Sequence, residues 1–126
     1  MAPNARFHFQ AACIACGTAV ALGAFASHGL KARLEPDLLV IFEVGVRYQF
    51  YHGLALLACS LAPANLWDSP WFPRAAWNWI AGILVFSGSL YLLAVTGQRW
   101  LGAITPIGGV AFLIGWACAL QASRRL

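Results

Sequence analysis

The stretch that decides the fold is FEVGVRYQFYH, residues 42–52, which places charged and polar side chains inside an otherwise apolar run. Glu43 and Arg47 are four residues apart, so on a helix they share one face, with the acid preceding the base in the favourable order. An ionised arginine near the centre of a bilayer costs about 3 kcal/mol and more without a partner. We therefore expect Glu43 and Arg47 to turn inward and pair between helices.

The same stretch contains a whole polar band, which is the main candidate for a binding or coupling site. Tyr48 and His52 are also four residues apart and are expected to form a hydrogen bond on a neighbouring face. The charged pair either fixes helix packing or couples a proton or ion, while a hydrogen-bonded core histidine is the favoured interpretation of His52. The predicted polar cluster comprises Glu43, Arg47, Tyr48, Gln49 and His52, and no catalytic residue is predicted.

The composition points to a membrane protein. Of the 126 residues, 61% are hydrophobic and 10% are charged, against about 25% charge in soluble domains, and the mean hydropathy is +0.72. The net charge of +4 is scattered along the chain, without the basic run that nucleic-acid binding requires. We expect anionic lipid headgroups, and membrane lipids in general, to be the partners of these basic side chains.

The length accommodates four spans of about 20 residues with short connections. We predict an all-α, integral membrane four-helix bundle that forms a single domain over residues 1–126. A connection rich in proline and tryptophan, residues 63–74, has the composition of an interfacial loop. The expected spans are residues 7–27, 36–62, 75–95 and 101–121.

The first apolar run has a second interpretation as a secretory signal peptide. Residues 24–26, Ala-Phe-Ala, resemble a signal-peptidase site. The run is longer than the usual apolar region of a signal peptide, and it carries a small residue at every fourth position, which favours close packing against another helix. The small-residue stripe consists of Ala11, Ala15, Ala19, Gly23 and Ser27.

Charge at the ends of the spans predicts the orientation. Four spans place both termini on one side, and that side carries four arginines against three basic residues on the other. This excess favours both termini in the cytoplasm. The two sets are Arg6, Arg74, Arg124 and Arg125 on one side, and Lys31, Arg33 and Arg99 on the other.

A second group of candidates lies near the ends of the spans. In TPIGG, residues 105–109, a proline removes one helix hydrogen bond and glycines expose the backbone, which either lines a ligand cavity or permits a bend and close helix contact. We expect a bend near Pro106. The secondary candidates are His28, Lys31, Thr105, Pro106, Gly108 and Gly109.

No metal or cofactor is predicted. Cys13 and Cys16 form a C-x-x-C pair, but no histidine or second pair nearby completes a ligand set. Haem ligation by His28 and His52 is disfavoured, because counting back from the first connection places them about 20 Å apart in depth. The same count places Arg47 near Thr18.

Four motifs resemble a known family. They are GAFASHGLK (23–31), FEVGVRYQFYHGLALL (42–57), FSGSLYLLAVTG (86–97) and ITPIGGVAFLIGW (104–116). Together they resemble the YgdD-like family, small bacterial inner-membrane proteins similar to eukaryotic transmembrane protein 256. Many relatives have GAFGAHGLK in the first motif, so Ala26 and Ser27 depart from the pattern. The resemblance implies four spans in the bacterial inner membrane and, because the family is a domain of unknown function, assigns no substrate.

The sequence favours a non-catalytic role for a multi-pass inner-membrane protein of unknown biochemical activity. We expect an interaction, assembly or lipid-associated factor, with a membrane protein or a second copy of the chain as a possible partner. The alternative is an oligomeric proton- or ion-coupled small transporter or channel, because four short helices seldom enclose a pathway alone. A membrane enzyme ranks third, since no hydrolase or nucleotide-binding motif is present.

Overall fold

The computed structural model describes residue 2 and residues 4–126 of the chain. These residues form helices, turns and short connections, with no strand among them. The all-α prediction is therefore confirmed for the part of the chain that is described. The helices are α1 (Ala5–Phe25), η1 (Ala26–Leu30), α2 (Pro36–Ser60), α3 (Ala64–Trp67), α4 (Trp71–Gly82), η2 (Ile83–Ser87), α5 (Gly88–Thr96), η3 (Arg99–Ala103), α6 (Thr105–Ala122) and η4 (Ser123–Arg125).

Several of these helices join end to end into long apolar rods. Among the described residues, three rods are long and apolar enough to cross a membrane: Ala5–Leu30, Trp71–Thr96 and Arg99–Arg125. The fourth long helix, α2, has 25 residues but is not one of the three, because charged and uncharged polar side chains together lower its mean hydropathy. Length and composition thus support three spans where the sequence analysis expected four.

Local sequence explains where the helices begin and end. Pro36 occupies the first turn of α2, after an extended backbone at Glu35, as expected for a residue with no amide hydrogen to donate. At the end of α5, Gly97 adopts a left-handed conformation with φ of 71°, and its N–H donates to the carbonyl of Leu93 at 2.8 Å. Pro106 lies in the first turn of α6. The bend expected at Pro106 is therefore the junction between the 3₁₀ turn η3 and α6, because proline starts this helix without breaking one.

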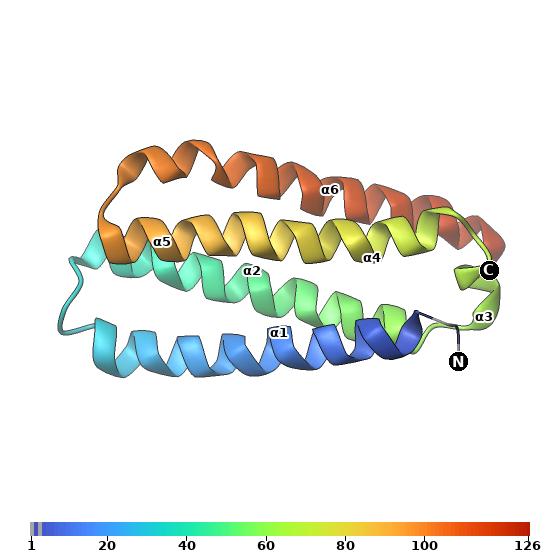
Figure 1. Ribbon diagram of the computed structural model, residues 1–126, viewed down its shortest axis with the longest axis horizontal. Helices are drawn as coiled ribbons and strands as arrows, with labels where there is room; N and C mark the ends of the chain where they lie inside the picture. The colour runs from blue at the N-terminus through green and yellow to red at the C-terminus, as the bar shows by residue number, and fades with distance from the viewer. Residues whose placement is uncertain (1, 3) are drawn as a thin grey trace.

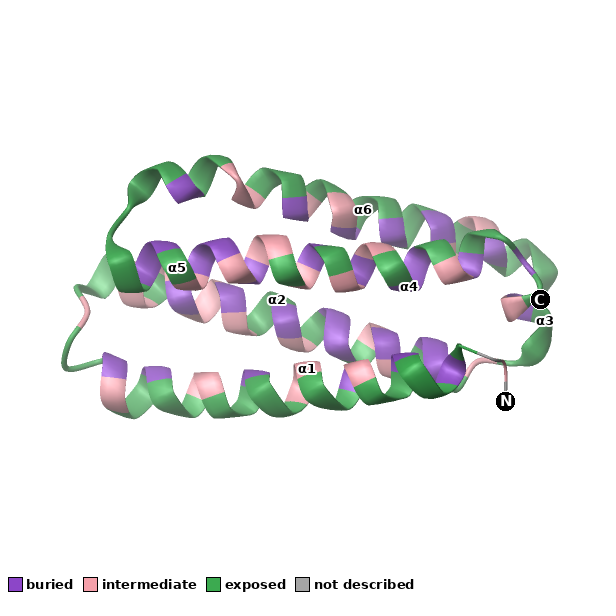
Figure 2. Ribbon diagram, viewed as in Figure 1, coloured by how far each residue is buried: buried purple, intermediate pink, exposed green. Residues whose placement is uncertain are grey.

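The long helices pack in neighbouring pairs (Figure 1). Helix α1 packs along α2, and α4 packs along α6, while α2 also contacts α5 and the π-helical turn η2. The start of α1 and the C-terminus lie at one end of the molecule, near α3 (Figure 1). Because α1 contacts the other helices chiefly through α2, most of its surface is exposed (Figure 2).

Small residues on α1 allow its close contact with α2. Ala12, Ala19 and Ala26 are buried along one side of this rod, whereas Ser27 is exposed. The observed packing stripe therefore differs from the expected one, which took every fourth residue. A helix has 3.6 residues per turn, so residues spaced alternately by three and four stay on one side of it, whereas every fourth residue drifts around it.

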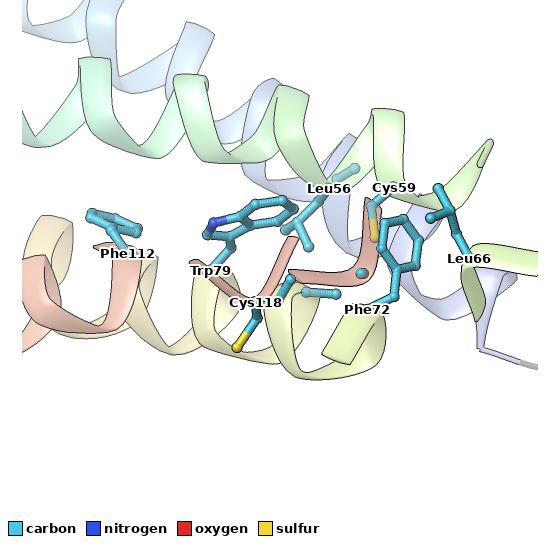
Figure 3. Close-up of a cluster of buried hydrophobic side chains, with 11 residues drawn as sticks. Leu56, Cys59, Leu66, Phe72, Trp79, Phe112 and Cys118 are labelled. Carbon is cyan, nitrogen blue, oxygen red and sulfur yellow. The ribbon is translucent and has the colours of Figure 1, made fainter. Parts of the chain in front are cut away.

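The main hydrophobic core lies between α2, α3, α4 and α6. Figure 3 shows its larger side chains, which include Leu56, Phe72, Trp79 and Phe112. Glycine brings α6 against η2, because a Cβ at Gly108 would collide with the backbone nitrogen of Phe86. Tight backbone packing of this kind holds membrane helices together where burial from water cannot.

Candidate functional site

The ion pair expected between Glu43 and Arg47 is not formed. Among the described residues, the single ion pair joins Asp37 to Arg99, and no side-chain hydrogen bond involves either Glu43 or Arg47. Arg47 is exposed and Glu43 is half-buried. The prediction was wrong because the inward face of α2 is defined by Gly45, and Arg47 lies about 200° around the helix from it.

The Asp37–Arg99 pair connects the first turn of α2 to the start of η3. Both side chains are more than half exposed, at 52% and 62%. Exposed pairs contribute little to stability because water screens them. This contact therefore serves chiefly to align two segments at the end of the molecule away from the termini.

Gln49 takes the inward position that was expected for the charges. Its side chain is 6% exposed. The amide nitrogen donates to the carbonyl of Ala15 at 2.9 Å and to the hydroxyl of Thr18 at 2.7 Å, and the amide oxygen accepts from the hydroxyl of Tyr91 at 2.7 Å. The carbonyl of Ala15 can only accept, which fixes the orientation of the amide. One carboxamide thus joins α1, α2 and α5.

His52 is a satisfied core residue that is held in its neutral form. Its Nδ1 lies 2.8 Å from the backbone oxygen of Tyr48, and the indole N–H of Trp116 donates to its Nε2 at 3.1 Å. An indole nitrogen only donates, so Nε2 is the acceptor and the proton sits on Nδ1. The ring of Phe112 stacks on the imidazole, with 3.6 Å between centroids. The expected hydrogen bond to the Tyr48 side chain is thus replaced by one to the Tyr48 backbone.

Replacing Trp116 with phenylalanine is expected to destabilise the protein by about 0.6 to 1.7 kcal/mol, the range for interhelical hydrogen bonds in membranes. The change removes the donor to His52 and keeps an aromatic ring. Denaturant titration of the detergent-solubilised protein measures the loss. Trp100→Phe is the matched control, since Trp100 is 62% exposed. An equal loss in both variants would contradict the assigned bond.

The secondary candidates divide into a packed group and an exposed group. The hydroxyls of Ser89 and Thr105 lie 2.6 Å apart, which links α5 to α6. Nearby, the hydroxyl of Ser87 donates to the carbonyl of Gly45 at 2.7 Å. The backbone of η2 packs directly against Gly108. Residues 105–109 therefore form a close helix contact and do not line a ligand cavity there. The remaining members lie apart from the Gln49 network: His28, Lys31 and Pro106 are exposed, and Gly109 is half-buried.

An elongated cavity lies beside the Gln49 network. It has a volume of about 540 Å³, and its walls come from α1, α2, α4, η2 and α5. Along α1 it extends from Phe7 to Leu22, which is about 22 Å at the rise of a helix. The lining is apolar except near Gln10 at one end and near the side chains of Thr18, Gln49 and Tyr91. We call this space the α1 groove.

Three residues that hydrogen-bond to Gln49 or His52 were not predicted as site residues: Thr18, Tyr91 and Trp116. A usable signal existed for Thr18, because the depth count from the first connection placed it near Arg47, two residues from its true partner Gln49. No comparable count relates α2 to α5 or α6, since those helices follow a longer connection. Among the described residues there is no group of three or more His, Cys, Asp or Glu that could hold a metal ion.

Comparison with known proteins identifies relatives over most of the chain. A family model described as "Protein of unknown function (DUF423)" matches residues 22–109. The chain is 44% identical over 105 residues to the UPF0382 membrane protein YwdK of Bacillus subtilis, covering 83% of this chain and 85% of that protein. It is 50% identical over 107 residues to the UPF0382 membrane protein SERP0230 of Staphylococcus epidermidis, covering 85% and 86%. A UPF0382 membrane protein of Haemophilus influenzae is 47% identical over 97 residues, covering 77% of each chain. No solved structure gives a significant match.

Proposed function

We propose, from the premise that this chain belongs to the DUF423 family of membrane proteins of unknown function, that it is a non-catalytic, lipid-associated factor that holds an acyl chain in the α1 groove. The single observation that carries this proposal is the elongated apolar cavity beside the Gln49 network. The proposal retains the lipid-associated role expected from the sequence and assigns it to a different part of the molecule.

The proposed setting is a four-span bundle in the bacterial inner membrane. Helix α2 is the fourth span, and it is enclosed by α1, α5 and η2 on its buried side. Both termini face the cytoplasm in this arrangement, in line with the excess of basic residues on their side. Membership in the narrower YgdD-like group, with its likeness to transmembrane protein 256, is part of the same proposal.

The shape of the α1 groove favours a lipid chain. Its long dimension follows α1, and therefore the bilayer normal if the helices span. The volume lies within the range of about 300–1,000 Å³ that is typical of small-molecule sites. A helix about 10 Å wide that crosses a hydrocarbon core of about 30 Å needs far more room. An extended acyl chain matches both the direction and the apolar lining.

Gly88 provides a direct test of the groove. It lines the α1 groove, and a Cβ at this position meets no atom within 4 Å. Gly88→Leu should therefore fill the space without disturbing the fold. We expect this variant to lose most of the phospholipid or fatty acid that the parent retains through purification, as measured by lipid extraction and native mass spectrometry.

Gly17→Leu is the matched control. Gly17 is also an α-helical glycine where an added Cβ would meet no atom within 4 Å, but it lies outside the groove. It should retain lipid at the parent level, and both variants should unfold at temperatures close to that of the delipidated parent. Equal lipid retention in Gly88→Leu and the parent would overturn the proposal.

A further inference from the structure

Arg47 lies on the outward face of α2, where no described residue of its own chain pairs with it. It is exposed, and among the described residues the only ion pair is formed elsewhere. Glu43 lies one turn earlier and about 40° around the helix, so it borders the same face. An exposed base and a half-buried acid therefore lie close together along one side of α2 without contacting each other.

The simplest partner for an exposed arginine in a membrane protein is a lipid headgroup, and the depth of Arg47 excludes it. It is the twelfth of the 25 residues of α2, about 16 Å from one end and 20 Å from the other. In the proposed four-span arrangement it therefore lies near the middle of the hydrocarbon core. Lipid headgroups lie outside that core, and acyl chains offer no acceptor for a guanidinium. A protein carboxylate is the partner that suits this depth.

We infer that this face of α2 is the contact between two copies of the chain, in which Arg47 of each copy pairs with Glu43 of the other. Copies with the same membrane orientation are related by a two-fold axis along the bilayer normal, so equivalent residues face each other at equal depth. Helical side chains lean toward the N-terminus, which carries the Arg47 guanidinium toward the level of Glu43 on the second copy. Each copy carries both Arg47 and Glu43, so a dimer contains two such ion pairs.

The surface around Arg47 is shaped for a neighbouring helix. A shallow groove of about 300 Å³ runs between α1 and α2 beside it, with Ala19 and Gly23 on one side and Phe50 and Tyr51 on the other. Tyr51 is 53% exposed. Small residues opposite the exposed Tyr51 ring leave room for the Tyr51 ring of a second copy to insert, and close backbone approach of this kind stabilises membrane helix dimers.

Two complementary variants distinguish pairing between copies from pairing within a copy. Glu43→Gln retains only the base, and Arg47→Gln retains only the acid. We expect each variant alone to dimerise at least tenfold more weakly than the parent in liposomes, as measured by energy transfer between labelled copies. An equal mixture should recover an intermediate level, because one ion pair forms in each mixed dimer. A mixture no stronger than either variant would overturn the inference.

Crosslinking locates the contact in a chain with Cys13, the exposed native cysteine, replaced by alanine. Leu54 on the same face of α2 is 45% exposed, and Leu113 on α6 is 70% exposed. We expect a short thiol crosslinker to join Leu54→Cys copies and to leave Leu113→Cys copies monomeric. Crosslinking of Leu113→Cys without crosslinking of Leu54→Cys would overturn the inference. The inference would also be overturned if the parent were monomeric and bound an anionic lipid that the Arg47→Gln variant no longer bound.

The inference rests on α2 being a span, and the same cysteine variant tests that separately. A membrane-impermeant maleimide should not label Leu54→Cys in intact vesicles. Labelling would remove both the fourth span and the dimer contact. Protection from labelling without crosslinking or energy transfer would overturn the dimer alone.

Discussion

Gly108→Ala is expected to destabilise the protein by about 3 kcal/mol or more, at the upper end of the range for overpacking. The added methyl group would overlap the backbone nitrogen and Cα of Phe86. A backbone cannot rotate away as a flexible side chain can, so α6 must move away from η2. That movement would also separate the hydroxyls of Ser89 and Thr105, which now lie 2.6 Å apart.

The neighbouring glycine provides the control for this change. A Cβ at Gly109 would lie 3.8 Å from the nearest atom of Phe86, which is an ordinary contact. Gly109→Ala should therefore be neutral or stabilise the helix by up to about 1 kcal/mol. Denaturant titration in mixed micelles, followed by circular dichroism, compares the two variants. Similar stabilities for Gly108→Ala and Gly109→Ala would contradict the close approach of α6 and η2.

Gln49→Leu is expected to cost about 2 kcal/mol. The leucine retains the approximate volume but removes three hydrogen bonds, to Ala15, Thr18 and Tyr91. Interhelical hydrogen bonds in membranes contribute about 0.6 kcal/mol each on average, which sums to nearly this figure. The loss should loosen α1 in particular, because Gln49 provides its side-chain hydrogen bonds to the rest of the chain.

Gln10→Leu is the matched control for Gln49→Leu, since Gln10 is exposed on α1 and its side chain makes no hydrogen bond among the described residues. It should leave the free energy of unfolding nearly unchanged. Hydrogen exchange of α1 amides provides a second measurement, and it should accelerate only in Gln49→Leu. Equal exchange in both variants would show that the Gln49 network does not hold α1 in place.

The helical class and the positions of the long helices could be predicted from the sequence. Apolar runs indicate the helices, and prolines and glycines indicate where helices begin and end. Helix α2 begins at Pro36, where the second span was expected to start, and α5 ends at Thr96, one residue beyond the expected end of the third span. Pro106 likewise indicated the junction between η3 and α6, whereas the π-helical turns left no comparable signal. One of these turns, η2, contains Phe86, whose backbone meets Gly108 of α6, a residue distant in sequence.

The candidate site was predicted only in part. Gln49 and His52 are inward and hydrogen-bonded, whereas the Glu43–Arg47 pair is absent. The error arose from treating the cost of burying charge as a reason for the charges to face inward. Residues four apart share a face, but the spacing does not say which way that face points. Gly45 and Gly53 indicate the direction, because these small residues lie where α2 packs closely against residues of α5 and α1, and Arg47 lies on the other side of the helix.

The pairing of each long helix with its neighbour in sequence has a consequence for biogenesis. Helices α1 and α2 form one hairpin, and the α4–α5 rod with α6 forms another, so in the proposed four-span arrangement each hairpin would enter the bilayer with its closest contacts already made. The bond between Gln49 and Tyr91 joins the two hairpins. The walls of the α1 groove come from both hairpins, so the groove exists only once the second hairpin has docked against the first.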